Sequence, residues 1–138
     1  MNILKKVETD GVKFVELEFT DIFGTLKSLE MPAGALKGAM ERGIWFDGSS
    51  IRGFARIMES DMFLKPDPET YSLLPCDNEE MKTARFMCEV YTPDGGIFAG
   101  DPRYILKKEI GEARDMGYHF RTGPEVEFYM FRKLDTGE

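Results

Sequence analysis

Residues 12–31 read VKFVELEFTDIFGTLKSLEM, and this stretch has the pattern of a β-hairpin. Side chains of a strand alternate between two faces, so Val15, Leu17 and Phe19 share one apolar face of the first strand. The segment TDIFG supplies turn residues, and TLKSLEM continues as a second strand. The stretch therefore predicts the start of a sheet that has one buried face.

The residues that follow predict more strands and one short helix. Pro32 is expected to open the helix and Gly43 to end it. Strands are expected around residues 62–65, 71–74 and 84–92, and the last of these alternates apolar and polar side chains. We therefore expect an α+β domain in which one curled sheet packs on a helix.

The period of the apolar pattern changes after residue 100. Asp101 is a credible N-cap and Pro102 a credible first residue of a longer helix, which Gly117 is expected to end. Residues 119–131, HFRTGPEVEFYMF, return to a strand pattern. We expect residues 1–100 to form one domain and residues 101–138 to begin a second one, so the chain reads as truncated.

Charge and composition argue against several classes of function. The 138 residues include 18 basic and 25 acidic side chains, which gives a net charge of −7 and no support for nucleic-acid binding. Cys76 and Cys88 are too far apart for a CxxC motif and His119 is the only histidine, which argues against a zinc site. The opening MNILKKVETDG has no sustained apolar run, and no stretch is long and apolar enough to span a membrane. These features predict a cytoplasmic protein with no membrane partner.

Two glutamates stand one residue apart in the last predicted strand. In an extended strand Glu125 and Glu127 share a face, roughly 6.6 Å apart. Like charges at that distance destabilise each other unless water screens them or a cation lies between them. The pattern by itself is compatible both with a solvated strand face and with a divalent-cation site.

A second group of polar residues lies in the stretch WFDGSSIRGF, residues 45–54. Asp47, Ser49 and Ser50 are typical of a tight turn, which explains them without any ligand. The segment ESDM then brings Asp61 to the far end of the same loop. Acidic residues in such places are usually only solvated.

Four stretches taken together resemble the amino-terminal portion of type I glutamine synthetase. They are FDGSSIRGF, ESDM, GDPR before a helix, and GPEVEF, in this order and at these spacings. FARIMESDM and MCEVYTPDG are most similar to the archaeal and Gram-positive subclass, and Phe54 stands where many relatives outside that subclass have Trp. The resemblance implies a β-grasp (ubiquitin-like) domain followed by the first helix and strand of the catalytic domain.

The same resemblance implies an ATP-dependent ligase that joins ammonia to glutamate through γ-glutamyl phosphate. Glu125 and Glu127 match the two glutamates that bind Mg²⁺ or Mn²⁺ on this strand. Asp47 matches the residue that binds ammonium and takes its proton, and Asp61 is a supporting anion.

Further residues receive roles from the resemblance alone. Ser49, Ser50 and Phe54 would shape the site, and Arg56 resembles the arginine through which the subclass senses glutamine. The family assembles as a homo-oligomer, expected to be a dodecamer, whose active sites are shared between subunits. The remaining metal ligands and most of the ATP pocket lie beyond residue 138, so this chain alone is expected to be inactive.

Two other functions remain compatible with the sequence. A related ligase could join glutamate to a different amine, and it would keep the metal strand but need no ammonium site. A non-catalytic β-grasp module could use the same fold for protein contacts.

Overall fold

The computed structural model describes residues 2–54, 61–75 and 79–132. The helices and strands follow one another along the chain in this order: α1 (Ile3–Thr9), β1 (Phe14–Thr20), β2 (Leu26–Pro32), α2 (Leu36–Arg42), β3 (Ile44–Asp47), β4 (Asp61–Pro66), β5 (Ser72–Leu73), β6 (Thr83–Tyr91) and α3 (Pro102–Asp115). Short 3₁₀ helices lie between them: η1 (Ala33–Ala35), η2 (Gly48–Ser50), η4 (Pro68–Thr70) and η5 (Glu79–Met81). No helix in these described ranges is long and apolar enough to cross a membrane.

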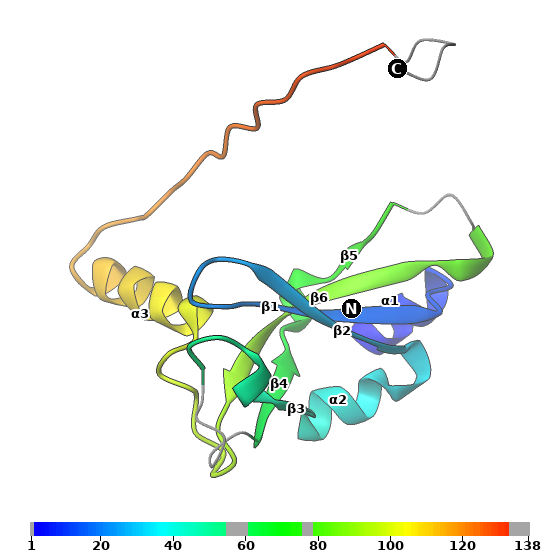
Figure 1. Ribbon diagram of the computed structural model, residues 1–138, viewed down its shortest axis with the longest axis horizontal. Coiled ribbons are helices and arrows are strands. Elements are labelled where there is room, and N and C mark those ends of the chain that lie inside the picture. Colours follow the sequence, from blue (N-terminus) through cyan, green and yellow to red (C-terminus); the bar gives the residue numbers. More distant parts are fainter. Residues whose placement is uncertain (1, 55–60, 76–78, 133–138) are drawn as a thin grey trace.

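The strands form one mixed sheet in the order β2-β1-β6-β4-β3, and β5 pairs with β6 beside this path. β1 pairs antiparallel with β2 and parallel with β6, so it lies in the interior of the sheet (Figure 1). β3 pairs with β4 alone and forms an edge. The curled sheet and the neighbouring helices confirm the predicted α+β fold.

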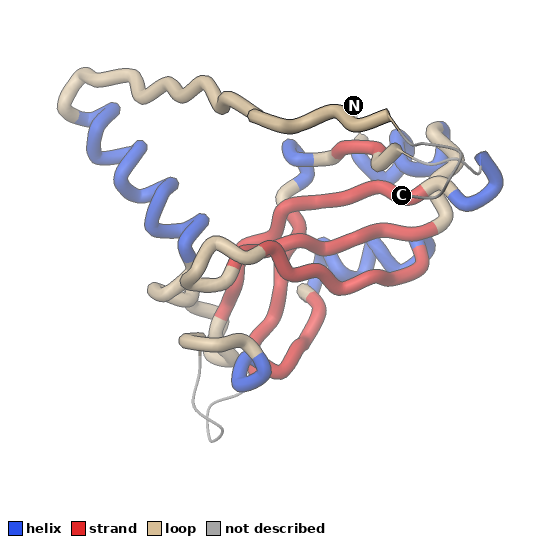
Figure 2. Tube along the Cα trace, turned by 45° about the horizontal axis from the view of Figure 1, so that its top comes forward, coloured by secondary structure: helices blue, strands red, loops and turns tan. Residues whose placement is uncertain are grey.

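Alternating side chains of the two central strands form the core. Val15 and Leu17 of β1 and Phe86 of β6 are all fully buried, as the sequence pattern predicted. Val7 of α1 and Leu36 of α2 join the same cluster, so both helices cover this face (Figure 2). The helix α1 was not predicted from the sequence.

Gly43 ends α2, as predicted, because only glycine fits there. Its φ is +77°, and a Cβ at this position would lie 2.5 Å from Cδ2 of Phe63. Pro32 differs from the prediction, because it closes β2 and the 3₁₀ turn η1 separates it from α2. A proline fits the end of a strand, where its missing N–H removes no ladder hydrogen bond.

Asp101 joins the start of α3 to the sheet. Its buried carboxylate accepts hydrogen bonds from the Val90 N–H of β6 at 3.1 Å and from the Arg103 N–H at 3.0 Å, the second of which is the predicted N-cap. Burial raises the pKa of Asp101, although both N–H groups act against that rise. Arg103 also donates to Asp67 at 2.5 Å, so the first turn of α3 is held at two points.

The prediction of a strand at residues 119–131 is wrong for this structure. Residues 118–132 follow α3 as extended, exposed chain without strand structure, and Figure 1 shows them leading away from the sheet. A strand is stabilised by hydrogen bonds to a neighbouring strand, and this segment pairs with no other part of the described chain. Alternation in the sequence specifies which side chains can share a face, but it does not supply the partner.

We expect Asp101→Ala to destabilise the protein by about 2–4 kcal/mol. The substitution removes an N-cap, which is worth about 1 kcal/mol, and leaves the buried Val90 N–H without its acceptor, which costs about 1–3 kcal/mol. Urea unfolding of the two proteins measures the difference. Asp115→Ala, at the exposed end of the same helix, is the control and should change stability by less than about 0.5 kcal/mol. Equal costs for the two substitutions would contradict this role of Asp101.

Candidate functional site

Asp47 stands where the edge strand β3 turns into η2. Its side chain caps η2 by accepting a hydrogen bond of 2.9 Å from the Ser49 N–H. Aspartate suits this position because its short carboxylate reaches the free N–H groups of the turn that follows. The sequence DGSS therefore forms a fixed turn, which we call the acidic loop together with the residues up to Phe54.

Both oxygens of the Asp47 carboxylate accept further hydrogen bonds. Oδ1 accepts from the Ser49 hydroxyl at 2.6 Å, and Oδ2 accepts from the Ser50 hydroxyl at 3.0 Å. These bonds, those from Ser49 first, hold the pKa of Asp47 below its usual value. Asp47 is nevertheless exposed, so its carboxylate is a fixed anion that a cation can approach.

The pairing of β3 with β4 brings Asp61 directly opposite Asp47. The antiparallel register sets Ile44 against Leu64 and continues, residue by residue, to the pair Asp47 and Asp61. Both aspartates are exposed. Like charges in facing positions of two strands repel each other, so this pair favours a cation or ordered water between them.

Phe54 anchors the far end of the acidic loop in the core. The residue is 6% exposed, and the centroid of its ring lies 5.9 Å from that of Phe19 and 5.2 Å from that of Phe98. Phe54 was predicted to shape a site, and it can do so only from beneath the loop, because almost none of its surface is exposed. Arg56 lies outside the described residues.

A hollow of about 260 Å³ lies beside Asp47, between the acidic loop and β2. Asp47, Ser50 and Ile51 line it from the loop. Lys27 and Ser28 of β2 line it as well, and no sequence motif predicted a site role for them. Their position beside Asp47 depends on how the acidic loop folds over the β1–β2 hairpin, which the sequence pattern does not specify.

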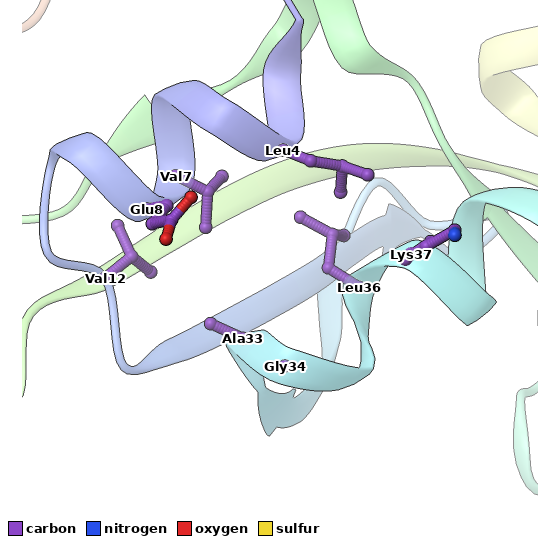
Figure 3. Close-up of a pocket in the computed structure, with 8 residues that line it drawn as sticks. All are labelled: Leu4, Val7, Glu8, Val12, Ala33, Gly34, Leu36 and Lys37. Carbon is purple, nitrogen blue, oxygen red and sulfur yellow. The ribbon is translucent and has the colours of Figure 1, made fainter.

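A second hollow, of about 310 Å³, lies between α1 and the start of α2 (Figure 3). Its walls are mainly aliphatic, with Leu4, Val7 and Leu36 pointing toward one another in the close-up. None of the residues predicted for a site lines it. The candidate site is therefore the acidic loop and not this groove.

Glu125 and Glu127 lie in the exposed chain after α3, in a stretch that pairs with no strand of the described residues. Carboxylate oxygens are the ligands that Mg²⁺ and Mn²⁺ prefer, but such ions need about six oxygen ligands. In residues 2–54, 61–75 and 79–132, no three His, Cys, Asp or Glu side chains gather in a way that could hold a metal. The two glutamates thus fit a metal site by their chemistry, and the other ligands have to come from elsewhere.

We expect Ser49→Ala to raise the pKa of Asp47 toward its usual value, because the substitution removes the hydroxyl that makes the largest single contribution to the lowering. A lowered pKa adds stability above the pKa of the unfolded chain, and that stability disappears as the pH falls through the folded pKa. In Ser49→Ala, the loop should therefore lose less stability than in the wild type when the pH falls through the pKa of Asp47. An NMR titration of the side-chain carboxyl groups measures the pKa of Asp47 in the wild type and in the variant.

Asp94 is an internal control for this titration, since the Thr92 hydroxyl lowers its pKa in the same way. Its midpoint should be equal in the two proteins. An unchanged Asp47 midpoint in Ser49→Ala would contradict the hydrogen-bond network described here.

Comparisons with known proteins identify the family that the chain resembles. Residues 11–93 match the family described as glutamine synthetase, beta-Grasp domain, and residues 99–138 match that described as glutamine synthetase, catalytic domain. The chain is 48% identical over 136 residues to the glutamine synthetase of Halobacterium salinarum, covering 98% of this chain and 30% of the relative. It is 48% identical to that of Thermotoga maritima, covering 99% of this chain and 31% of the relative.

Solved structures give the same fold. The cryo-EM structure of Plasmodium falciparum glutamine synthetase has a TM-score of 0.72 at 27% identity, covering 85% of this chain and 23% of that one. A structure described as "Apo GmaS without ligand" has a TM-score of 0.74 at 23% identity over 83% of this chain and 26% of that one, and supports the fold alone. The chain spans about 30% of the length of the curated relatives it matches. It belongs to the glutamine synthetase family and corresponds to the amino-terminal portion of its members.

Proposed function

We propose that this chain is part of a glutamate–ammonia ligase that joins ammonia to glutamate through γ-glutamyl phosphate, with ATP as co-substrate. The observation that carries the proposal is the exposed, facing pair of Asp47, which begins the acidic loop, and Asp61 of β4, in a chain that matches the family over nearly its whole length. Residues 1–100 would be the β-grasp domain, and residues 101–138 the start of the catalytic domain. An ATP-dependent biosynthetic reaction of this kind is expected in the cytoplasm.

Asp47 is proposed to hold the ammonium ion. The hydrogen bonds from Ser49 and Ser50 keep its carboxylate ionised, which is the form that attracts a cation. They also weaken it as a base, because a lowered pKa means a lower proton affinity. Proton transfer to Asp47 therefore requires that the pKa of ammonium be lowered as well, which removal from water would achieve. Asp61, across the strand pair, would add a second negative charge to the same place.

Glu125 and Glu127 are proposed to bind Mg²⁺ or Mn²⁺ together with ligands outside the described residues. Such a cation, when bound, neutralises charge on the phosphate oxygens during phosphoryl transfer. Most of the ATP pocket would likewise lie outside this chain. Two carboxylates and one acidic loop form only portions of a site, so the chain alone is proposed to be inactive.

We also propose that these two portions serve different active sites in a ring of identical subunits, expected to be a dodecamer. The acidic loop follows the edge strand β3, and its Asp47 is exposed, so a neighbouring molecule could contact it there. The extended chain that carries the glutamates leaves the end of α3, a different part of the molecule from the β3 edge (Figure 2). One subunit would thus supply Asp47 to a site whose metal ligands belong to its neighbour.

A ligase for larger amines is the second candidate, and the pair Asp47 and Asp61 favours ammonia over it. The full-length protein should form glutamine from glutamate, ATP and ammonium much faster than it forms amides from methylamine or ethylamine. A preference for an alkylamine would overturn the assignment of ammonia. A full-length protein that uses no amine at all would support a non-catalytic module.

For metal binding, we expect the 138-residue chain to show no tight site for Mg²⁺ or Mn²⁺ in titration calorimetry. The reason is that two carboxylates supply only part of the roughly six oxygen ligands these ions need. Glu127→Ala should leave the titration of the chain unchanged, and the same substitution should weaken Mn²⁺ binding by the full-length protein. A tight stoichiometric site in the chain would mean that its ligand set is more complete than proposed.

For the shared site, we expect Asp47→Ala to lower the rate of the full-length enzyme by about 10²–10⁴-fold, the usual contribution of a positioned acid–base group. Glu127→Ala should abolish phosphoryl transfer by weakening the metal site. When the two purified variants are dissociated and reassembled together, subunits with intact Glu127 can receive Asp47 from a neighbour. Mixed rings should therefore recover part of the wild-type activity.

The control for this experiment is each variant reassembled alone, which should stay inactive. Mixed rings that native mass spectrometry detects but that recover no activity would contradict site sharing.

A further inference from the structure

The turn between β1 and β2, residues 21–25, packs against the acidic loop. The clearest sign is Gly53, whose φ is +87° and whose Cβ, if it had one, would lie 2.3 Å from Cδ1 and 2.9 Å from Cγ1 of Ile22. Any other residue at position 53 would be strained by its backbone and would displace Ile22. The loop and the turn are therefore in close contact at this point.

A second contact lies next to the first. The guanidinium carbon of Arg52 lies 5.2 Å from the centroid of the Phe23 ring, within the range of a cation–π interaction. Consecutive residues of the loop, Arg52 and Gly53, thus meet consecutive residues of the turn, Phe23 and Ile22. Two adjacent contacts fix both the position and the orientation of this part of the loop.

The turn itself is held rigidly. Asp21 is 4% exposed, and its Oδ1 accepts hydrogen bonds of 2.9 Å from both the Phe23 and the Thr25 N–H groups. Although burial raises the pKa of Asp21, these bonds and the Lys27 ammonium, 3.8 Å away, keep it below the usual value. Ile22 and Phe23 are therefore presented from a fixed backbone.

Ile22 and Phe23 contribute little to the hydrophobic core. They are 49% and 62% exposed, and neither belongs to the buried cluster. Single apolar side chains are often exposed on protein surfaces, so exposure alone gives Ile22 and Phe23 no role. Their contacts with Gly53 and Arg52 supply one.

We infer that Ile22 and Phe23 are positioning residues for Asp47, which act by holding the acidic loop at the place where it binds ammonium. This inference rests on the proposed function. The loop is tied to the core at both of its ends, and the turn restrains it between them. Because a displacement of about 1 Å can cost on the order of 10²-fold in rate, a contact that only steadies a loop can still control the reaction.

The test uses the double variant Ile22→Ala/Phe23→Ala. In the full-length enzyme, KM for ammonium should rise by on the order of tenfold, while KM for glutamate and for ATP stays within about twofold. Ile22→Val and Phe23→Tyr keep the branched chain and the ring, so they should restore the wild-type KM for ammonium. Leu73→Ala is the matched control, since Leu73 on β5 is 44% exposed and should leave all three constants unchanged.

Hydrogen exchange of the 138-residue chain gives a second readout that needs no activity. The Ile51 and Phe54 N–H groups, which donate within the loop at 3.1 and 3.0 Å, should exchange about tenfold faster in the double variant. The amides of β6 should keep their protection, which shows that the sheet stays folded. If the double variant unfolds, Phe23→Leu removes the ring alone and takes its place in both measurements.

The outcomes separate the inference from the proposed function. An unchanged KM for ammonium with unchanged loop exchange would overturn the inference while the enzyme still makes glutamine. Equal increases in all three KM values would also overturn it, because they indicate general damage. A wild-type full-length protein that makes no glutamine would overturn the proposed function, and loop exchange would then decide whether the turn holds the loop.

Discussion

The packing of Phe19 between Phe46 and Phe54 is the interaction on which the candidate site depends. The ring centroids lie 5.1 and 5.9 Å apart, and Phe19 belongs to the central strand β1. Phe46 immediately precedes Asp47, and Phe54 follows Gly53, so the hydrophobic core itself fixes both ends of the acidic loop. Aromatic pairs at such distances contribute about 0.5–1.5 kcal/mol beyond the area they bury, which is enough to favour one loop geometry.

The molecule uses aspartate in two physically different ways. Asp21 and Asp101 are buried, and backbone N–H groups satisfy their carboxylates, so they hold a turn and a helix in place. Asp47 and Asp61 are exposed and face each other, and neither forms an ion pair with a lysine or arginine in the described part of the chain. The first kind of aspartate explains the architecture, and the second kind leaves a charge that a ligand can neutralise. This contrast separates structural from candidate functional acids without reference to any relative.

The sequence predicted those parts of the fold that depend on interactions between residues close together in the chain. The hairpin, the alternation in β6, the Gly43 end of α2 and the Asp101 cap of α3 are all confirmed, because each depends on neighbours in sequence. The facing of Asp47 and Asp61 could not be predicted, since it depends on the register of two strands separated by a loop. The contact of Gly53 with Ile22 was missed for the same reason. The prediction of a strand at residues 119–131 was wrong because an alternating pattern indicates which side chains share a face but does not provide a strand to pair with.

We propose above that a loop fixed by the core of one subunit completes the metal site of another. The most direct measurement is a structure of the full-length assembly with ADP, Mn²⁺ and a glutamate analogue. We expect each Asp47 carboxylate to point into the site that contains Glu125 and Glu127 of an adjacent subunit, and to lie far from Glu125 and Glu127 of its own chain. An Asp47 that shares a site with Glu127 of the same chain, or that faces solvent in the closed ring, would contradict it.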